Sequence, residues 1–306
     1  MSVIAALNTT PLPPALSERV ICEFGVDVRS EDALRNVLHK YADSIDTVWN
    51  LAAPLSVATA KDPTHARNVT VLGMQRLLEA MRAVGLRKIC FSDSIGSFGA
   101  EAPRDDASAC WLLEHPTQDP GSEYGRQKRE CRELLREYAE RYGFDTRFAI
   151  LPGVLHRRST WGGGTTEYAL DALMAAARMI PYACPLPLDA RLPMIYIDDL
   201  VRGLIALMDA PVESLREREH GYTLAGFSFT PAELFATVAD IAPDLRFAFR
   251  IDLTANPHAQ LFASLWPDSI SKTEATRDLG FTAQWDLPST VSAILMAFRT
   301  YIAKEQ

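Results

Sequence analysis

Short apolar runs alternate with helix-length amphipathic segments along the first half of this 306-residue chain. The runs "DTVWNLAA" (46–53), "KICFSDS" (88–94) and "DTRFAILPG" (145–153) are typical of buried strands. A helical segment, 121–142, lies between the last two and ends at Gly143. Strands separated by helices of this length favour a parallel sheet that is covered on both faces. We therefore predict an α/β fold on a doubly wound parallel sheet, with ligands bound at the strand ends of one edge.

The rhythm of the chain changes after residue 155 into a mixture of helices and short strands, with several prolines between 181 and 193. We predict a sheet domain over residues 1–154 and a smaller, substrate-facing lobe over 155–306. Within that lobe, "LPMIYIDDLVRGLIALMDA" has a strand-then-helix pattern. Residues of about 192–209 are therefore expected to return to the main sheet.

Composition excludes several classes of protein. The chain is 48% apolar and 23% charged, which is ordinary for a globular enzyme, and its net charge of −8 argues against a phosphate backbone as partner. No apolar run approaches the length needed to span a bilayer. The five cysteines and six histidines are dispersed without metal-ligand spacing. We expect a cytoplasmic protein without a metal site that binds neither nucleic acid nor membrane.

The motif "EYGRQKRE" (123–130) places Tyr124 and Lys128 four positions apart on one helical face. Lys128 lies in a stripe whose other members, at positions 131, 135, 138 and 142, are Cys, Leu, Tyr and Tyr. A lysine on an apolar face is costly to bury without a task, which favours a functional pair over a chance spacing. A free phenol has a pKa of about 10, and a nearby ammonium favours the phenolate that can act as a base.

A second candidate group follows the strand at 88–94. The segment "FSDSIGSFG" presents Ser92 and Ser94 where a parallel sheet binds its ligands. Either serine could hold a reacting oxygen, or could instead satisfy backbone groups in a turn.

These motifs together resemble the extended short-chain dehydrogenase/reductase superfamily, which has a Rossmann-like fold. The superfamily resemblance rests on "NLAAPLS", "FSDSIGSFG", "EYGRQK" and "ILPGVL". More narrowly, "GGGTTEYAL", "RLPMIYIDDL", "FSFTPAEL" and "WPDSISKTEATRDLGF" resemble the L-threonine 3-dehydrogenases of that superfamily. The likeness runs from the first strand almost to the end of the chain.

The resemblance implies an NAD-dependent oxidation of a small amino acid, L-threonine, to a 2-amino-3-keto acid. It gives Tyr124 the proton transfer, Lys128 the nicotinamide ribose and Ser94 the substrate hydroxyl. It also implies a homodimer through helices near 70–84 and 121–142. Further residues implied to line the cofactor are Asp27 and Val28 near the adenine, Leu51, Ala52, Ala53 and Asn68 along its length, and Pro152 beside the nicotinamide. Those implied to face the amino acid are Ser56, Thr165 and Thr166.

The chain also departs from the family pattern. It has no G-x-x-G-x-x-G turn, which would cradle the pyrophosphate, and its only glycine-rich run is 162–164. The start "SVIAALNTT" resembles the family's second strand, so the first βα unit of roughly 30 residues is expected to be absent. Asn8 then stands where an acid would bond the ribose. Other departures are Asn50, Asp93, Arg132 and "HRRST" (156–160).

Two questions stay open, namely the origin of the absent unit and the activity of the chain. The absent unit is explained either by a start placed too late in the sequence or by an incomplete or repurposed relative. A nucleotide-sugar epimerase or dehydratase would use the same tyrosine and lysine. A relative that no longer holds dinucleotide would have no catalytic activity.

Overall fold

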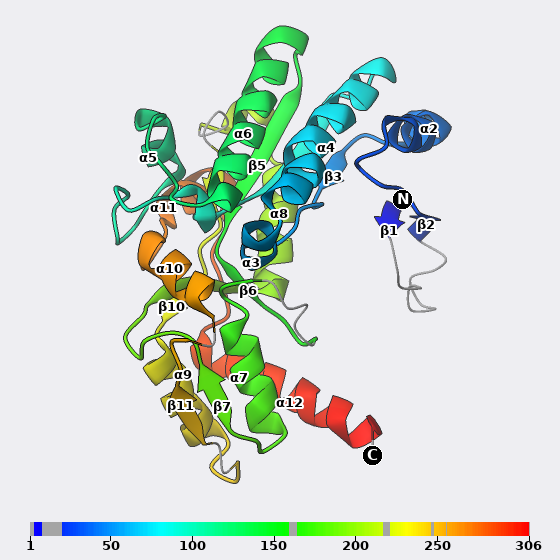
Figure 1. Cartoon of the computed structure of the whole chain (residues 1–306). Coiled ribbons are helices and arrows are strands. Elements are labelled where there is room, and N and C mark those ends of the chain that lie inside the picture. The colour runs from blue at the N-terminus through cyan, green and yellow to red at the C-terminus, as the bar shows by residue number, and fades with distance from the viewer. Residues whose placement is uncertain are drawn as a thin grey trace.

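The computed structural model describes residues 3–7, 20–158, 164–216, 221–245, 248–254 and 256–305. Asn8 and most of the glycine run at 162–164 lie outside these residues. The chain forms a parallel sheet flanked by helices, with a second lobe below it in Figure 1. The α/β, Rossmann-like fold predicted from the sequence is confirmed.

The main sheet has four parallel strands in the order β3-β4-β5-β9. They are β3 (Val48–Asn50), β4 (Lys88–Ser94), β5 (Asp145–Leu151) and β9 (Tyr222–Thr223). β4 is hydrogen-bonded along its length to β5 and has a neighbour on each side. The residues that follow β4 therefore lie at the carboxyl ends of the strands, with a neighbouring strand on each side. Ligands bind at this edge in sheets of this type.

Helices cover both faces of this sheet, as the alternation of side chains along a strand requires. Ile89 and Phe91 pack in one cluster with α4 (Pro63–Ala83) and α6 (Glu123–Tyr142). Cys90 and Ala149 point the other way and pack with α8 (Ile197–Asp209). A short helix, α3 (Ser56–Lys61), leads from β3 into α4.

The N-terminal part forms a separate pair of strands. β1 (Val3–Leu7) and β2 (Val20–Phe24) are parallel partners that no hydrogen bond links to β3 among the described residues. Figure 1 shows them beside α2 (Glu31–Tyr41), which packs against α4. We expected Trp49 on β3 to be buried, but it is 39% exposed because β3 has β4 as its only described neighbour.

The second lobe is built from small sheets and several helices. β6 (Gly153–Leu155), β8 (Leu192–Tyr196) and β10 (Phe227–Phe229) form one sheet in the order β10-β8-β6. β7 (Tyr182–Cys184) pairs with β11 (Phe249–Ile251). The helices here are α7 (Tyr168–Ala177), α9 (Pro231–Ile241), α10 (Pro257–Leu265) and α12 (Leu287–Glu305). α11 (Thr273–Leu279) packs instead with α8 and β9 on the main sheet, and α5 (Ala109–Glu114) follows β4 at the edge of that sheet.

The expected return of 192–209 to the main sheet holds only for the helix. α8 does pack on that sheet, but β8 pairs with β6 and β10 instead. The strand that extends the main sheet beside β5 is β9. β8 is apolar at every position and fully buried, so its pattern alone could not select between two neighbouring sheets.

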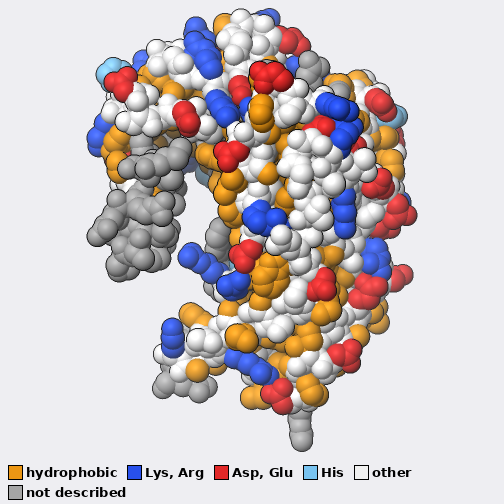
Figure 2. Space-filling model, turned by 180° about the vertical axis from the view of Figure 1, so that it is seen from behind, with side chains coloured by type: hydrophobic (Ala, Val, Ile, Leu, Met, Phe, Trp, Pro, Cys, Tyr) orange, Lys and Arg blue, Asp and Glu red, His pale blue; other side chains and the backbone are white. Residues whose placement is uncertain are grey.

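The surface carries both signs of charge. Figure 2 shows Lys and Arg side chains interspersed with Asp and Glu on the face seen from behind. None of the helices in the described ranges is long and apolar enough to cross a membrane.

Candidate active site

Helix α6 positions the predicted tyrosine and lysine. It begins after Ser122, whose side chain accepts the backbone N–H of Gly125, and ends at Gly143 in the left-handed conformation. Lys128 is only 2% exposed, and its Nζ donates a hydrogen bond to the carbonyl oxygen of Ser92 at 2.6 Å. Its ammonium lies 5.6 Å from the ring centroid of Tyr124. The buried position expected for Lys128 is thus observed, with a bond to β4 that compensates its burial.

Ser94 lies at the end of β4, where the chain enters a short 3₁₀ turn, η2 (Ile95–Ser97). Its Oγ accepts the backbone N–H of Gly96 at 3.1 Å. A Cβ atom built on Gly96 would lie 2.8 Å from Cδ1 of Tyr124 and 3.5 Å from Oγ of Ser94. The phenol ring and the serine hydroxyl therefore lie on the same side of Gly96, around the space that a side chain at this position would occupy. The structure brings the three predicted reacting residues together.

Asp93 and Arg132, two departures from the family pattern, form an ion pair with each other. Asp93 is 2% exposed, and its Oδ2 lies 3.2 Å from Nε of Arg132 on α6. Its Oδ1 accepts the backbone N–H of Ser94 at 2.8 Å and the hydroxyl of Ser97 at 2.6 Å. A carboxylate near the tyrosine would by itself disfavour the phenolate. In the structure a guanidinium balances that charge.

The residues expected to face the amino acid also lie together. Ser56, at the start of α3, has its Oγ 3.1 Å from Oγ1 of Thr165, and also accepts the backbone N–H of Thr165 at 3.3 Å. Both side chains are buried. Thr166 lies against Gly153, where an added Cβ would come within 2.6 Å of the Thr166 Cβ. These contacts join α3 to the segment that precedes α7, next to the point where β5 passes into β6.

The residues expected along the cofactor differ in their exposure to solvent. Pro152 is buried between β5 and β6, while Leu51 and Ala52 are exposed after β3 and Ala53 is half-buried. The backbone N–H of Ala52 donates to Oδ1 of Asn50 at 3.3 Å. Asn50, one of the departures from the family pattern, thus holds the loop that leaves β3.

Three further cofactor candidates already have protein partners. Oδ1 of Asn68 accepts from Nη1 of Arg76 at 3.1 Å. The Asp27 carboxylate lies 2.6 Å from Nη2 of Arg29, and these hydrogen bonds lower the pKa of Asp27 to about 2. Val28 packs against Gly73 of α4. Their roles toward the adenine end stay predictions.

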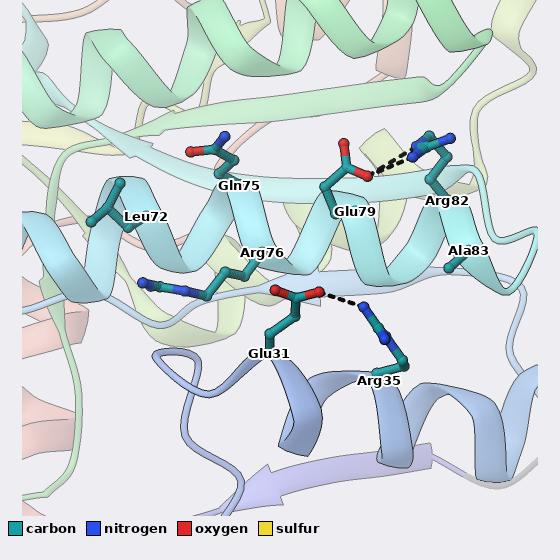
Figure 3. A pocket seen from close by; sticks show the side chains of 8 residues that line it. All are labelled: Glu31, Arg35, Leu72, Gln75, Arg76, Glu79, Arg82 and Ala83. Atoms are coloured by element: carbon teal, nitrogen blue, oxygen red, sulfur yellow. Dashed lines mark hydrogen bonds and ion pairs between the residues drawn. The ribbon is translucent and has the colours of Figure 1, made fainter.

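A groove of about 390 Å³ between α2 and α4 is separate from these groups. Figure 3 shows Glu31 and Arg35 of α2 paired with each other, Glu79 and Arg82 of α4 likewise paired, and Arg76 lying between them. Three arginines and two glutamates line the groove, and Arg76, which belongs to neither ion pair, donates a hydrogen bond to Asn68.

The comparisons with known proteins agree with this arrangement. The sequence pattern of the NAD dependent epimerase/dehydratase family matches residues 3–220. The chain belongs to this family. NAD is the cofactor by which the family is described.

Two relatives have different descriptions. The mitochondrial L-threonine 3-dehydrogenase of Bos taurus is 33% identical over 251 residues, which cover 82% of this chain. This chain spans only 64% of the length of that bovine protein. An uncharacterized epimerase/dehydratase of Staphylococcus haemolyticus is 30% identical over 272 residues, or 89% of this chain and 81% of that protein.

A solved structure supports the same fold. It is the holo form of a GalE-like L-threonine dehydrogenase from Cupriavidus necator, with a TM-score of 0.80 and 32% identity. The match covers 93% of this chain and 88% of that one.

The described residues fit NAD at one end better than at the other. Lys128, Ser94 and Pro152 lie together at the edge of the main sheet, where a nicotinamide and its ribose would bind. At the other end, the residues after β1, "NTTPLPPALSE", stand where the resemblance implies the adenosine ribose, and they lie outside the described residues. We therefore assign protein groups to the nicotinamide end alone.

Sequence reasoning missed one partner in this site. It treated Arg132 as a departure and not as the counter-charge of Asp93. The available signal was its spacing, because Arg132 follows Lys128 by four residues and so lies on the same face of α6.

Proposed function

We propose that this protein is an NAD-dependent dehydrogenase that oxidises the secondary alcohol of L-threonine to give 2-amino-3-ketobutyrate. The observation that carries the proposal is the buried Lys128, bonded to β4 beside Tyr124 and Ser94. The similarity to proteins described as L-threonine dehydrogenases supports the choice of substrate.

In this reaction Tyr124 takes the proton of the substrate hydroxyl onto its phenolic oxygen, as a general base. Ser94 orients that hydroxyl, and its own position is fixed by the turn at Gly96. Lys128 supplies the positive charge that favours the phenolate over the phenol. NAD, when bound, would accept the hydride from the carbon that carries the hydroxyl. The alcohol is thereby oxidised to a ketone and NAD is reduced to NADH.

The pair of Ser56 and Thr165 would recognise the amino acid. Both are hydroxyl groups buried next to the end of β5, and they already share a hydrogen bond. Hydroxyls placed in this way can donate to a carboxylate or accept from an ammonium. A buried site built to hydrogen-bond a polar substrate rejects analogues that leave these groups unpaired.

The test is a substrate panel read by NADH absorbance. The 306-residue chain is given NAD with L-threonine, with L-serine, or with a uridine diphosphate sugar. We expect NADH to form with L-threonine and with neither of the other two substrates. Conversion of the nucleotide sugar without net NADH would instead assign the chain to the epimerases, which its 30% identity to the staphylococcal protein keeps as a candidate.

A non-catalytic relative is the second candidate, favoured by the separation of β1 and β2 from the main sheet among the described residues. Calorimetry with NAD distinguishes the two. Micromolar binding contradicts the non-catalytic assignment, and no binding at millimolar NAD contradicts the dehydrogenase.

We further propose that the protein is a homodimer through α4 and α6. These helices pack side by side and are bridged on their outer surface by Arg67 and Glu130, at 2.6 Å. Light scattering is expected to give twice the chain mass of 33.9 kDa. A monomer at all concentrations would contradict this assembly.

A further inference from the structure

The ion pair between Asp93 and Arg132 is built as a buried unit. The side chain of Asp93 is completely buried and that of Arg132 is 12% exposed. A buried carboxylate without a partner is strongly destabilising, and here a guanidinium and two hydrogen-bond donors surround it. Oδ1 accepts hydrogen bonds from Ser94 and Ser97, whereas Oδ2 has no hydrogen-bond partner among the described residues and is held by its ion pair with Arg132.

This pair lies directly beside the reacting residues. Tyr124, Lys128 and Arg132 follow one another at intervals of four along α6, so they share one face. Lys128 bonds the carbonyl of Ser92, and Arg132 contacts the carboxylate of the next residue, Asp93. The helix is thus attached to β4 at two consecutive residues, immediately before Ser94.

The second attachment continues to Ser94 itself. Asp93 Oδ1 accepts the backbone N–H of Ser94, so the carboxylate that Arg132 holds also fixes the residue that caps the start of the turn η2. The Ser97 hydroxyl, at the end of that turn, donates to the same oxygen. A shift of Asp93 would therefore move both ends of the turn that contains Gly96, against which the Tyr124 ring lies.

We propose that Asp93 and Arg132 are positioning residues, which set the Ser94 hydroxyl relative to the Tyr124 phenol. The two charges cancel each other, so that Lys128 remains the net charge beside the phenol. This inference rests on the proposed dehydrogenase function for its kinetic consequence, and on the structure alone for its effect on the turn.

The first test measures the turn without any activity. Hydrogen exchange of a peptide spanning 92–99 is followed by mass spectrometry in the parent chain, in Arg132→Met and in Asp93→Asn/Arg132→Met. The double variant leaves neither charge unpaired, so it keeps the test valid if the single variant folds poorly. We expect exchange of the Ser94 amide to rise about tenfold in both variants, because its acceptor is no longer held.

Arg136→Met is the matched control. Arg136 lies one turn further along α6 with an exposed side chain. Hydrogen exchange of the peptide 92–99 in Arg136→Met should equal that in the parent chain. Equal exchange in Arg132→Met and Arg136→Met would overturn the proposal.

The second test is kinetic and uses L-threonine with NAD. We expect Arg132→Met to lower kcat by about tenfold to a hundredfold with the KM for NAD unchanged, since a reacting group is misplaced and not removed. Arg132→Lys, which keeps the charge, should restore part of kcat. A lower melting temperature with unchanged kcat per folded molecule would show a merely structural pair and overturn the proposal.

The two tests separate the possible failures. If the parent chain does not oxidise L-threonine, the proposed function fails, and the exchange measurement still decides whether Arg132 and Asp93 hold the turn.

Discussion

Two regions of the molecule are built in different ways. The catalytic region, made of β4, η2 and α6, has its central strand paired on both sides, a lysine that is 2% exposed and a buried ion pair. The N-terminal region, made of β1, β2 and α2, contains a sheet of only two strands, and Phe24 of β2 is 58% exposed. The groups that would move a proton are held firmly, whereas the strands near the adenine end have few partners among the described residues.

Proton transfer and binding of the far end of NAD are therefore expected to depend on different parts of the structure. The proposed proton acceptor, Tyr124, lies on α6, which packs against β4, η2 and α4. The predicted residues for the far end of NAD, Asp27 and Val28, belong to the N-terminal region and are attached to the rest through α2 and α4. Changes in one region should therefore leave the other largely intact, as the following variants can show.

The largest effect is expected for Lys128→Met. The substitution removes the ammonium but keeps an unbranched side chain of similar volume in the apolar stripe. We expect kcat to fall by about a hundredfold. The free energy of unfolding should change by less than about 2 kcal/mol, because replacing a buried charge with an apolar group is often neutral.

Lys88→Met is the control for this variant. Lys88 lies at the other end of β4, where its Nζ donates to the carbonyl of Met208 at 2.8 Å. It should keep the parent kcat in the same NADH assay. A similar loss of activity in both variants would mean that Lys128 on α6 and Lys88 on β4 both act through stability and not through the tyrosine.

The next effect is a difference in stability between two Gly→Ala substitutions in helices. A Cβ at Gly125 on α6 would collide with the carbonyl oxygen of Gly96 and lie 2.5 Å from Cβ of Pro120. Because backbone cannot yield cheaply, we expect Gly125→Ala to lower the free energy of unfolding by about 1–3 kcal/mol. Urea denaturation measures this value.

Gly73→Ala on α4 is the matched comparison, at the junction with the N-terminal region. Its nearest contact would be Cγ2 of Val28 at 3.0 Å, a side chain that can move by a few tenths of an ångström. The higher helix propensity of alanine, about 1 kcal/mol, should offset that cost. Equal destabilisation by the two substitutions would show that the regions are packed equally tightly.

The smallest effect concerns cysteine reactivity in the two regions. Burial raises the pKa of the Cys90 and Cys131 thiols to about 12, so at pH 8 only about one thiolate in ten thousand is present. Cys22 on β2 is half-buried. Maleimide labelling followed by mass spectrometry should modify Cys22 well before Cys90 or Cys131. Labelling of Cys131 at the rate of Cys22 would indicate that α6 opens as easily as the N-terminal strands.

Sequence reasoning predicted helix α6 and the burial of Lys128 well because their signals are local. The apolar stripe of α6 placed Lys128 on the buried face, and Gly143 marked the helix end. The order of strands in a sheet depends instead on contacts between distant segments. For that reason the separation of β1 and β2 from the main sheet, and the pairing of β8 with β6, did not follow from periodicity.

The pairing of Asp93 with Arg132 shows the same limit inside the site. From the sequence, each residue is only a departure from the family pattern. The sequence does not state which face of β4 packs against which turn of α6, so it does not pair the two. Only the packed structure places the two charges 3.2 Å apart.

The most direct test of the central claim compares the parent chain with Tyr124→Phe in an assay for NADH formed from L-threonine. The phenylalanine ring would keep the contact with Gly96, so the fold is preserved while the phenolic oxygen is lost. Tyr142→Phe, on the exposed end of the same helix, serves as control. The account predicts activity in the parent and control, and at least about a hundredfold loss in Tyr124→Phe. Equal NADH production by all three proteins would contradict it.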